Sequence, residues 1–275
     1  MRVLSLFDGM SCGQIALNKI GIKPSAYYAS EIKPVAIKVA QHNYPDTIQV
    51  GDVREIRASD VGHIDLLIGG SPCQDFSRAN SSRDGLQGSK SGLFYEYLRL
   101  FDELKPRHWL LENVVMPPHD QAIVSGLLGR DPVRINSSLV SAQLRDRLYW
   151  TNIGGSTYDL FGRPSSDIQL PQDKGELLQD ILTSGTTDRK KARALLESDS
   201  RPLANQEKII RRYKNGFTTI VFEDGYVRYF NQTELELLQT VPLGYTSCLT
   251  RNQAASVLGD GWTVDVIAHI FAGLK

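Results

Sequence analysis

Cys73 is the residue of this sequence best placed to act as a nucleophile. It follows Asp65–Ile68, a short apolar run typical of a buried parallel strand, and the break made by Gly69 and Gly70. Ligands bind in open α/β sheets at the carboxyl ends of the strands, where this turn would hold the thiol. Most free cysteines are small buried apolar residues, and this stretch alone leaves that alternative open. We expect a reactive thiolate here.

Glu112 ends a second apolar run, His108–Leu111, and precedes Asn113 and Val114. A carboxyl group at the end of a buried strand lies in a low-dielectric setting that favours its protonated form near neutrality. If both runs are strands of one sheet, Cys73 and Glu112 face the same pocket. The pair would then be a nucleophile and a general acid.

Two arginines alternate in the extended pattern Gln143-x-Arg145-x-Arg147. This spacing directs both side chains to one face of the chain. Alternating charges are usually a solvated edge, but two arginines near an active site could also hold a phosphate or a base carbonyl.

The first 53 residues predict the elements that position these groups. A strand over 2–7 leads into a glycine-containing turn and a helix that stops at Gly21, and further strands are expected over 26–30 and 48–50. This alternation is typical of a doubly wound α/β sheet. Asp8, Glu31 and Asp52 follow the three strands, so together they outline an adenosine site, with Glu31 accepting from the ribose hydroxyls. A helix-capping role for Glu31 is equally compatible.

The rest of the chain divides into catalytic framework and insert. We expect helices over 93–104, 233–238 and 264–274, strands over 134–141 and 147–151, and a polar loop over 78–91. Residues 154–225 are polar, with a helical run near 192–196, and residues 189–214 carry nine basic and three acidic residues. Such a basic stretch suggests a phosphate-contacting surface, or a solvated helix face. The framework would therefore be 1–153 and 226–275, and the insert a recognition region.

Composition limits the classes of protein. The chain has 275 residues, 41% hydrophobic and 23% charged, with 31 basic and 31 acidic residues, as in an ordinary globular protein. No run of 18 apolar residues occurs and the chain begins directly in a strand pattern, so we expect no membrane span and no secretory signal. Three scattered cysteines predict a reducing, cytoplasmic setting without a disulfide framework or metal site.

These motifs, in this order, resemble the cytosine-5 DNA methyltransferase family nearly end to end, most closely its de novo (animal-type) branch and the prokaryotic and phage relatives. The motifs that carry the resemblance are FDG at Phe7–Gly9, GD at Gly51–Asp52, GGSPCQ at Gly69–Gln74, ENV at Glu112–Val114, QxRxR at Gln143–Arg147 and the block Gly259–Trp262.

The resemblance implies a Rossmann-like methyltransferase fold that uses S-adenosylmethionine, releases S-adenosylhomocysteine and carries a small inserted target-recognition region. Cys73 would attack carbon 6 of a cytosine flipped out of double-stranded DNA, and Glu112 would protonate or hydrogen-bond its ring nitrogen 3. Arg145 and Arg147 would hold the base and the backbone. The residues expected to bind the cofactor are Phe7, Asp8, Gly9, Glu31, Asp52, Val53, Pro72, Asp260 and Trp262. Those expected to contact DNA are Gln74, Ser77, Lys190, Lys191, Arg211 and Arg212.

Asp260 departs from the family, in which most members have Asn at this position and the animal branch has Arg. A carboxylate there could pair with the amino group of the cofactor or crowd its carboxylate.

The alternatives are a catalytically weak or regulatory DNA-binding homologue, a tRNA cytosine-5 methyltransferase and a small-molecule methyltransferase. The RNA branch carries a Cys-Phe-Thr signature that this sequence lacks. We expect a cytoplasmic protein of a prokaryote or phage, or a nuclear one if eukaryotic, in a restriction-modification, phage or epigenetic setting. A homodimer would widen the DNA footprint.

Overall fold

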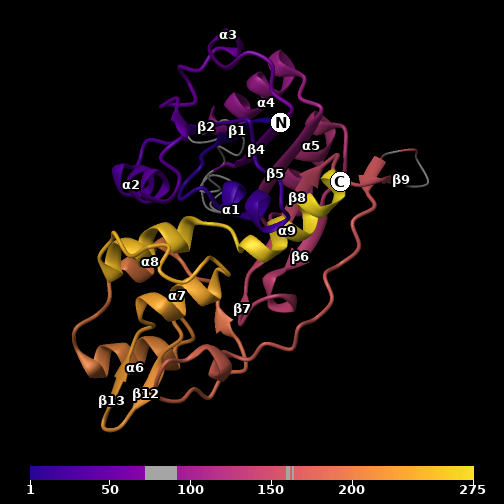
Figure 1. Ribbon diagram of the computed structural model, residues 1–275. Helices are drawn as coiled ribbons and strands as arrows, with labels where there is room; N and C mark the ends of the chain where they lie inside the picture. Colours follow the sequence, from indigo (N-terminus) through magenta and orange to yellow (C-terminus); the bar gives the residue numbers. More distant parts are fainter. Residues whose placement is uncertain (72–91, 159–161, 163) are drawn as a thin grey trace.

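The chain builds a large sheet lobe and a smaller lobe beside it (Figure 1). The computed structural model describes residues 1–71, 92–158, 162 and 164–275. The large sheet has seven strands in the order β3-β2-β1-β4-β5-β8-β6. Its strands are β1 (Arg2–Leu6), β2 (Ala26–Ser30), β3 (Ile48–Gln49), β4 (Leu66–Gly70), β5 (His108–Val114), β6 (Val133–Asn136) and β8 (Asp146–Thr151).

Strands β1 to β5 are parallel, whereas β8 runs antiparallel to both β5 and β6. Parallel strands need crossover connections, and helices supply them. The helices of this lobe are α1 (Cys12–Lys19), α2 (Pro34–Asn43), α3 (Ala58–Val61), α4 (Gly92–Leu104), α5 (Pro118–Leu128) and α9 (Val264–Phe271). The predicted doubly wound α/β fold is confirmed.

Two apolar layers cover the sheet because alternate strand residues point to opposite faces. Leu110 of β5 belongs to the core shared with α1, α2 and α9, whereas Trp109 and Leu111 belong to the core shared with α3, α4 and α5. With both faces buried, the strands read as the continuous apolar runs seen in the sequence. Both layers hold the carboxyl ends of β1, β2, β4 and β5 at one edge.

The smaller lobe is formed by residues from about 178 to 260 together with β7 (Figure 1). Its elements are β7 (Gln143–Leu144), η3 (Leu178–Ile181), β11 (Ala192–Arg193), η4 (Glu197–Ser200), α6 (Gln206–Lys214), β12 (Val221–Glu223), β13 (Tyr226–Arg228), α7 (Gln232–Leu238) and α8 (Arg251–Asp260). The helical run expected near 192–196 is wrong, because Ala192 and Arg193 pair with β7 as a strand. Helix α6, which the sequence analysis did not foresee, lies within the basic stretch.

Three short elements remain outside both lobes' main structures. They are the hairpin of β9 (Ser156–Tyr158) and β10 (Pro164–Ser166), η2 (Ser137–Leu139) and η5 (Ala272–Leu274). Residues 251–274 form the one described stretch that is apolar and long enough to cross a membrane. It is interrupted between α8 and α9, and 61% of its most apolar window is buried, as in a core helix of a globular fold.

Candidate active site

Glu112 is the centre of a buried polar cluster at the carboxyl end of β5. Only 8% of the residue is exposed. The Nε atom of Arg147 lies 2.9 Å from its Oε1, and the indole Nε1 of Trp262 donates to its Oε2 at 3.1 Å. The apolar setting expected from the sequence is therefore not what the structure has. Both carboxylate oxygens have polar partners, one of them a cation, so the group is held in a fixed orientation.

Gly70 gives this cluster its room. It is paired with Glu112 across the neighbouring strands β4 and β5. A Cβ at this position would lie 2.7 Å from Trp262 Nε1 and 2.9 Å from Glu112 Oε2. The close approach of the three residues thus requires glycine, and the sequence analysis used Gly70 only as a strand break.

Asn113 fixes the start of the segment that carries the expected nucleophile. It is buried and donates to Ser71 Oγ at 3.1 Å. Ser71 is the last described residue before position 92, so Pro72, Cys73, Gln74, Ser77 and the loop 78–91 lie outside the described residues. The strand that leads to Cys73 and the strand that ends at Glu112 are neighbours, as expected, because Gly70 of β4 is paired with Glu112 of β5.

Arg145 and Arg147 differ in what they touch. Arg147 pairs with Glu112, whereas the buried Arg145 donates to the carbonyl oxygens of Leu195 at 2.9 Å and Gly261 at 2.8 Å. Burial and the neighbouring Arg147 lower the pKa of Arg145 to about 10. Arg145 therefore joins the small lobe to the chain before Trp262, and in this geometry its fork does not face the open side of Glu112.

Gln143 completes this joint. It is fully buried, and its amide donates to Gln239 Oε1 at 3.0 Å and accepts from the backbone of Leu195 at 3.3 Å. A buried network of this kind is stable only when all its members have partners, which fixes the relation of the two lobes.

The first turn, Phe7–Ser11, forms a second polar group at the ends of β1 and β2. Asp8 is buried and accepts from Tyr27 Oη at 2.8 Å and from the Ser11 hydroxyl. Burial is the main reason that the pKa of Asp8 is raised to about 6, against the effect of these donors. Asp8 is thus an internal support of the turn. Phe7 has φ of +57°, which is rare for a bulky residue and typical of functional turns.

Glu31 holds the turn from the neighbouring strand. Its Oε2 accepts from the backbone N–H of Gly9 at 2.8 Å, and its Oε1 accepts from those of Ile32 and Lys33 at 2.7 and 2.8 Å. A carboxylate has about four lone-pair sites, so at least one is left for a ligand hydroxyl. Glu31 therefore orders the two residues that precede α2 without capping the helix itself, and it still presents a free acceptor.

Asp52 and Asp260 are each paired with a cation that the sequence analysis did not name. Arg54 forms an ion pair with Asp52 and lowers its pKa. Lys33 Nζ lies 2.7 Å from Asp260 Oδ2, bridging the loop after β2 and the end of α8. Both partners of this second pair are well exposed. Val53 is buried, and its carbonyl accepts from Arg99 of α4 at 3.1 Å.

The side chains at this edge of the sheet have the chemistry needed to bind a nucleoside with a charged amino-acid tail. Glu31 has an acceptor left for a ribose, Phe7 is half-buried in a strained turn, and Lys33 and Asp260 offer both charges for an ammonium and a carboxylate. The pattern GxGxxG is absent from the first turn, which argues against a dinucleotide. Within the described ranges, no group of three or more metal-ligating side chains occurs.

The four cations expected to contact DNA are not equivalent. Lys190 and Arg211 are exposed and Arg212 is half-buried. The ammonium group of Lys191 is instead held by the carbonyl oxygens of Ser138 at 2.8 Å and Ser141 at 2.9 Å. The structure thus gives Lys191 a role in joining the lobes.

Of the two described cysteines, Cys12 is poorly suited to be a nucleophile. Cys12 is buried, and its burial raises its pKa to about 12, so its thiolate is scarce near neutrality. Cys248 is half-buried.

Comparison with known proteins agrees with the resemblance. Residues 1–119 match the family "C-5 cytosine-specific DNA methylase". The chain is 40% identical over 116 residues to the orphan methyltransferase M.Rho11sI of Bacillus phage rho11s, a match that covers 42% of this chain and 23% of the relative. It is 34% identical over 135 residues to the type II methyltransferase M.NlaIV of Neisseria lactamica, a match that covers 47% of this chain and 32% of the relative. The matches span about a quarter to a third of these relatives' length.

Solved structures resemble the whole fold. The Entamoeba histolytica methyltransferase EhMeth has a TM-score of 0.77 at 16% identity, covering 100% of this chain and 99% of the other. A putative DNA modification methyltransferase encoded within a prophage of E. coli has a TM-score of 0.69 at 20% identity, and the match covers 100% of this chain and 98% of the other. At these identities the likeness shows the fold alone.

Proposed function

We propose that this chain, whose residues 1–119 match the C-5 cytosine-specific DNA methylase family, transfers a methyl group from S-adenosylmethionine to carbon 5 of cytosine in double-stranded DNA. The observation that carries the proposal is the Glu112–Arg147–Trp262 cluster at the end of β5, next to the strand that leads to Cys73.

The proposed chemistry begins at Cys73. Cytosine is a poor electrophile and is inaccessible in the stack, so the base must be flipped out before its ring can be attacked. The Cys73 thiolate forms a bond from Sγ to carbon 6, and ring electrons move toward nitrogen 3 and carbon 5. S-adenosylmethionine supplies the methyl group to carbon 5 when bound. A base, such as water, then removes the carbon 5 proton, and Cys73 leaves as carbon 6 regains its double bond.

Glu112 is proposed to donate a proton or a hydrogen bond to nitrogen 3 as Sγ adds to carbon 6, and to take that proton back when Cys73 leaves. Arg147 and Trp262 orient its carboxyl group from two sides, which leaves the group little freedom to turn away. Such preorganised partners stabilise charge as it develops. Arg147, next to Glu112, is proposed to bind the exocyclic oxygen of the same base.

The N-terminal edge is proposed to bind the cofactor. Phe7 would stack on the adenine, Glu31 would accept from the ribose, and Asp52 and Val53 would border the adenine edge. Asp260 and Trp262 would lie at the methionine end, where an aromatic face favours a sulfonium cation. The expected contacts of Pro72 with the cofactor, and of Gln74 and Ser77 with DNA, belong to the same proposal.

A labelled-methyl assay followed by bisulfite sequencing tests the function. The protein is incubated with labelled S-adenosylmethionine and plasmid DNA, with RNA of matched sequence in parallel. Label in plasmid at defined cytosines supports the proposal. Label only in RNA supports a tRNA-type enzyme, and no label in either, from folded protein that binds the duplex, supports a regulatory homologue. Sedimentation of the same sample tests for the proposed homodimer.

A further inference from the structure

Leu144 and Arg193 form an exposed pair where the small lobe joins the catalytic strand. In the parallel ladder of β7 and β11, Gln143 is opposite Ala192 and Leu144 is opposite Arg193. Paired residues on neighbouring strands point to the same face. Gln143 and Ala192 are fully buried, whereas Leu144 is 51% exposed and Arg193 is exposed. One face of this ladder is therefore core, and the other faces outward.

The backbone of Arg193 is held in place, whereas its guanidinium has no partner among the described residues. Its backbone is fixed by β7 and by a hydrogen bond from its N–H to Thr219 Oγ1 at 3.0 Å. In the part of the chain that the structure describes, no carboxylate or carbonyl accepts from its side chain. Arg201 and Arg228, by contrast, are paired with glutamates. An unpaired guanidinium can bind an anion without first breaking an ion pair.

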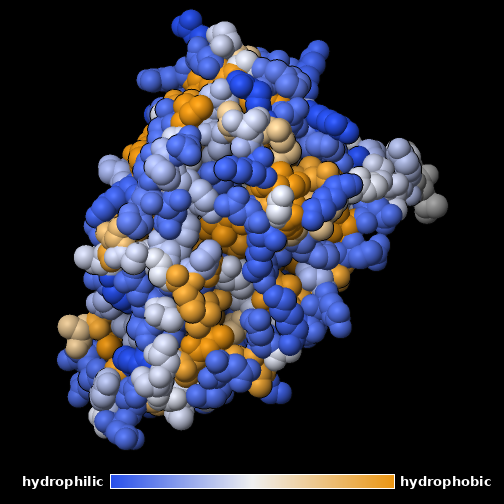
Figure 2. Space-filling view, in the orientation of Figure 1, coloured by the Kyte–Doolittle hydropathy of each residue, from blue (hydrophilic) through white to orange (hydrophobic). Residues whose placement is uncertain are grey.

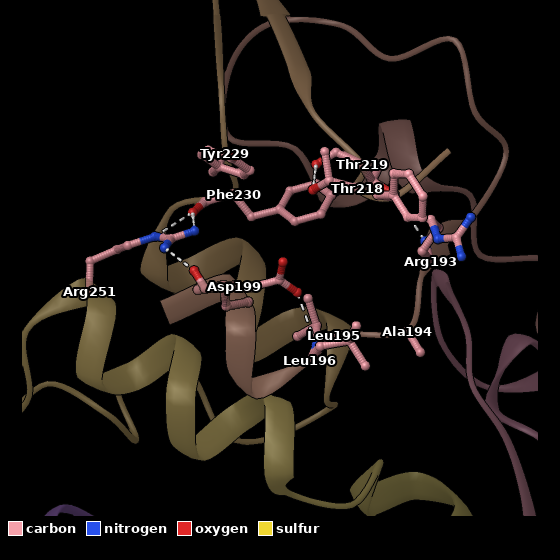
Figure 3. Close-up of a pocket in the computed structure, with 12 residues that line it drawn as sticks. Arg193, Ala194, Leu195, Leu196, Asp199, Thr218, Thr219, Tyr229, Phe230 and Arg251 are labelled. Atoms are coloured by element: carbon pink, nitrogen blue, oxygen red, sulfur yellow. Dashed lines mark hydrogen bonds between the residues drawn. The ribbon is translucent and has the colours of Figure 1, made fainter. Parts of the chain in front are cut away.

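Phe217 adds an exposed aromatic ring beside this cation. It is 65% exposed, and it follows Gly216, where φ is +74° and an added Cβ would lie 3.5 Å from the guanidinium of Arg193. Both residues line a cavity of about 30 Å³, room for little more than one water. In Figure 3 Arg193 lies at the opposite end of this cavity from Arg251 and away from Asp199. A ligand must therefore contact the rim, because the cavity is too small for a base.

The neighbourhood is hydrophobic as well as basic. Leu196, the next exposed residue along the same segment, is 51% exposed. Figure 2 shows hydrophobic side chains gathered on the visible face of the smaller lobe, among mostly polar ones. Lys190 and Arg211 supply further exposed positive charge on this lobe.

This surface is close to the reacting group. Leu144 lies three residues before Arg147, so their Cα atoms are at most ~10 Å apart, and Arg193 is one strand spacing, ~5 Å, further. Arg147 is in contact with Glu112. The Cα atoms of Arg147 and Arg193 are therefore at most ~15 Å apart, which is about the length of four nucleotide steps of a duplex strand.

We propose that Leu144, Arg193 and Phe217 contact the DNA strand that flanks the flipped cytosine. Arg193 binds a backbone phosphate, and Phe217 stacks on or beside a neighbouring base with Leu144 closing its edge. The inference rests on the proposed function and deepens it, because it identifies the surface that holds the substrate. Arg193 lies in the basic stretch 189–214 but is not one of the four cations expected from the sequence to contact DNA.

The test measures the Kd of the wild type and of variants for a fluorescein-labelled duplex at several salt concentrations. The duplex contains a methylation site found by bisulfite sequencing. Arg193→Gln should weaken binding and lower the slope of log Kd against log salt by about 1, and Arg193→Lys should restore the slope. Phe217→Ala should weaken binding about tenfold, as expected for loss of one stacked base, without changing the slope. Lys23→Gln, at the opposite edge of the sheet, and Leu170→Ala, exposed in the linker after β10, are the matched controls and should bind as the wild type does.

Methyl transfer separates this inference from the function. If the wild type methylates the duplex and both variants bind and react like the controls, the surface contacts something other than DNA and the inference is overturned. A raised KM for DNA, with unchanged S-adenosylmethionine affinity and melting temperature, supports it. Failure of the wild type to methylate any duplex would overturn the proposed function itself.

Discussion

Trp262 Nε1 donates to Glu112 Oε2 across 150 positions of sequence, at 3.1 Å. This contact joins the last motif of the chain to the end of β5, and Arg147 holds the other carboxylate oxygen. The site is thus assembled from three segments around one carboxyl group, and Gly70 leaves the space in which they meet.

Glu112→Gln tests the role of this carboxyl group. The amide can still accept from Trp262 but cannot deliver a proton or pair with Arg147. We expect the methyl-transfer rate to fall by about 10²- to 10⁴-fold, the usual contribution of a general acid. Calorimetry should show S-adenosylmethionine binding nearly unchanged. A variant that keeps wild-type kcat would rule out Glu112 as the acid.

Gly70→Ala tests the crowding at the site. The new methyl group would lie under 3 Å from both Trp262 Nε1 and Glu112 Oε2, so one of them must move. We expect kcat to drop at least tenfold while the protein remains folded. Gly126→Ala is the control, since nothing lies within 4 Å of its Cβ in α5 and alanine should stabilise that exposed helix by about 0.5–1 kcal/mol. Equal kcat in both variants would contradict the geometry.

Asp8 predicts a pH dependence of stability. Its folded pKa of about 6 exceeds the ordinary 3.8, so folding favours the protonated form. The contribution of Asp8 to the free energy of unfolding is therefore complete below about pH 4, and it is lost as the pH rises through about 6. The wild type should therefore lose on the order of 3 kcal/mol of unfolding free energy relative to Asp8→Asn between pH 4 and 7. Urea unfolding of both proteins measures this difference, and a constant gap at all pH values would contradict it.

The Lys33–Asp260 pair predicts an effect on cofactor affinity without one on stability. Both partners are well exposed, so breaking the pair should change the unfolding free energy by less than about 1 kcal/mol. Lys33→Gln leaves a carboxylate unpaired near the cofactor's own carboxylate and should weaken S-adenosylmethionine binding. The double variant with Asp260→Asn should recover much of that loss. Titration calorimetry on the wild type, the single variant and the double variant measures the three affinities. A double variant that binds S-adenosylmethionine as weakly as the single one would contradict the predicted repulsion.

The sequence predicts the elements with strong local signals. Helix α4 begins one residue before the expected 93–104, and α7 begins one residue before the expected 233–238, after Asn231, whose side chain accepts from Glu234 N. The burial of β5 follows from its apolar run. These features depend on periodicity and capping, which are local properties.

The partners of site residues could not be predicted in the same way. Arg145 and Arg147 alternate identically in the sequence, but one is bound to carbonyl groups of the small lobe and the other to Glu112. The strand at Ala192–Arg193 exists because β7 pairs with it, against its own helical pattern. Long-range packing overrides local preference at both places.

The central claim is a covalent bond between Cys73 and the flipped base, and trapping tests it most directly. With 5-fluorocytosine at the target position, the carbon 5 substituent cannot leave as a proton, so elimination of Cys73 is blocked. Incubation with S-adenosylmethionine should yield a stable protein–DNA adduct, with the modified peptide containing Cys73. Cys73→Ala, which keeps Cys12 and Cys248, should form none. An active enzyme that forms no adduct, or one attached through another residue, would contradict the account.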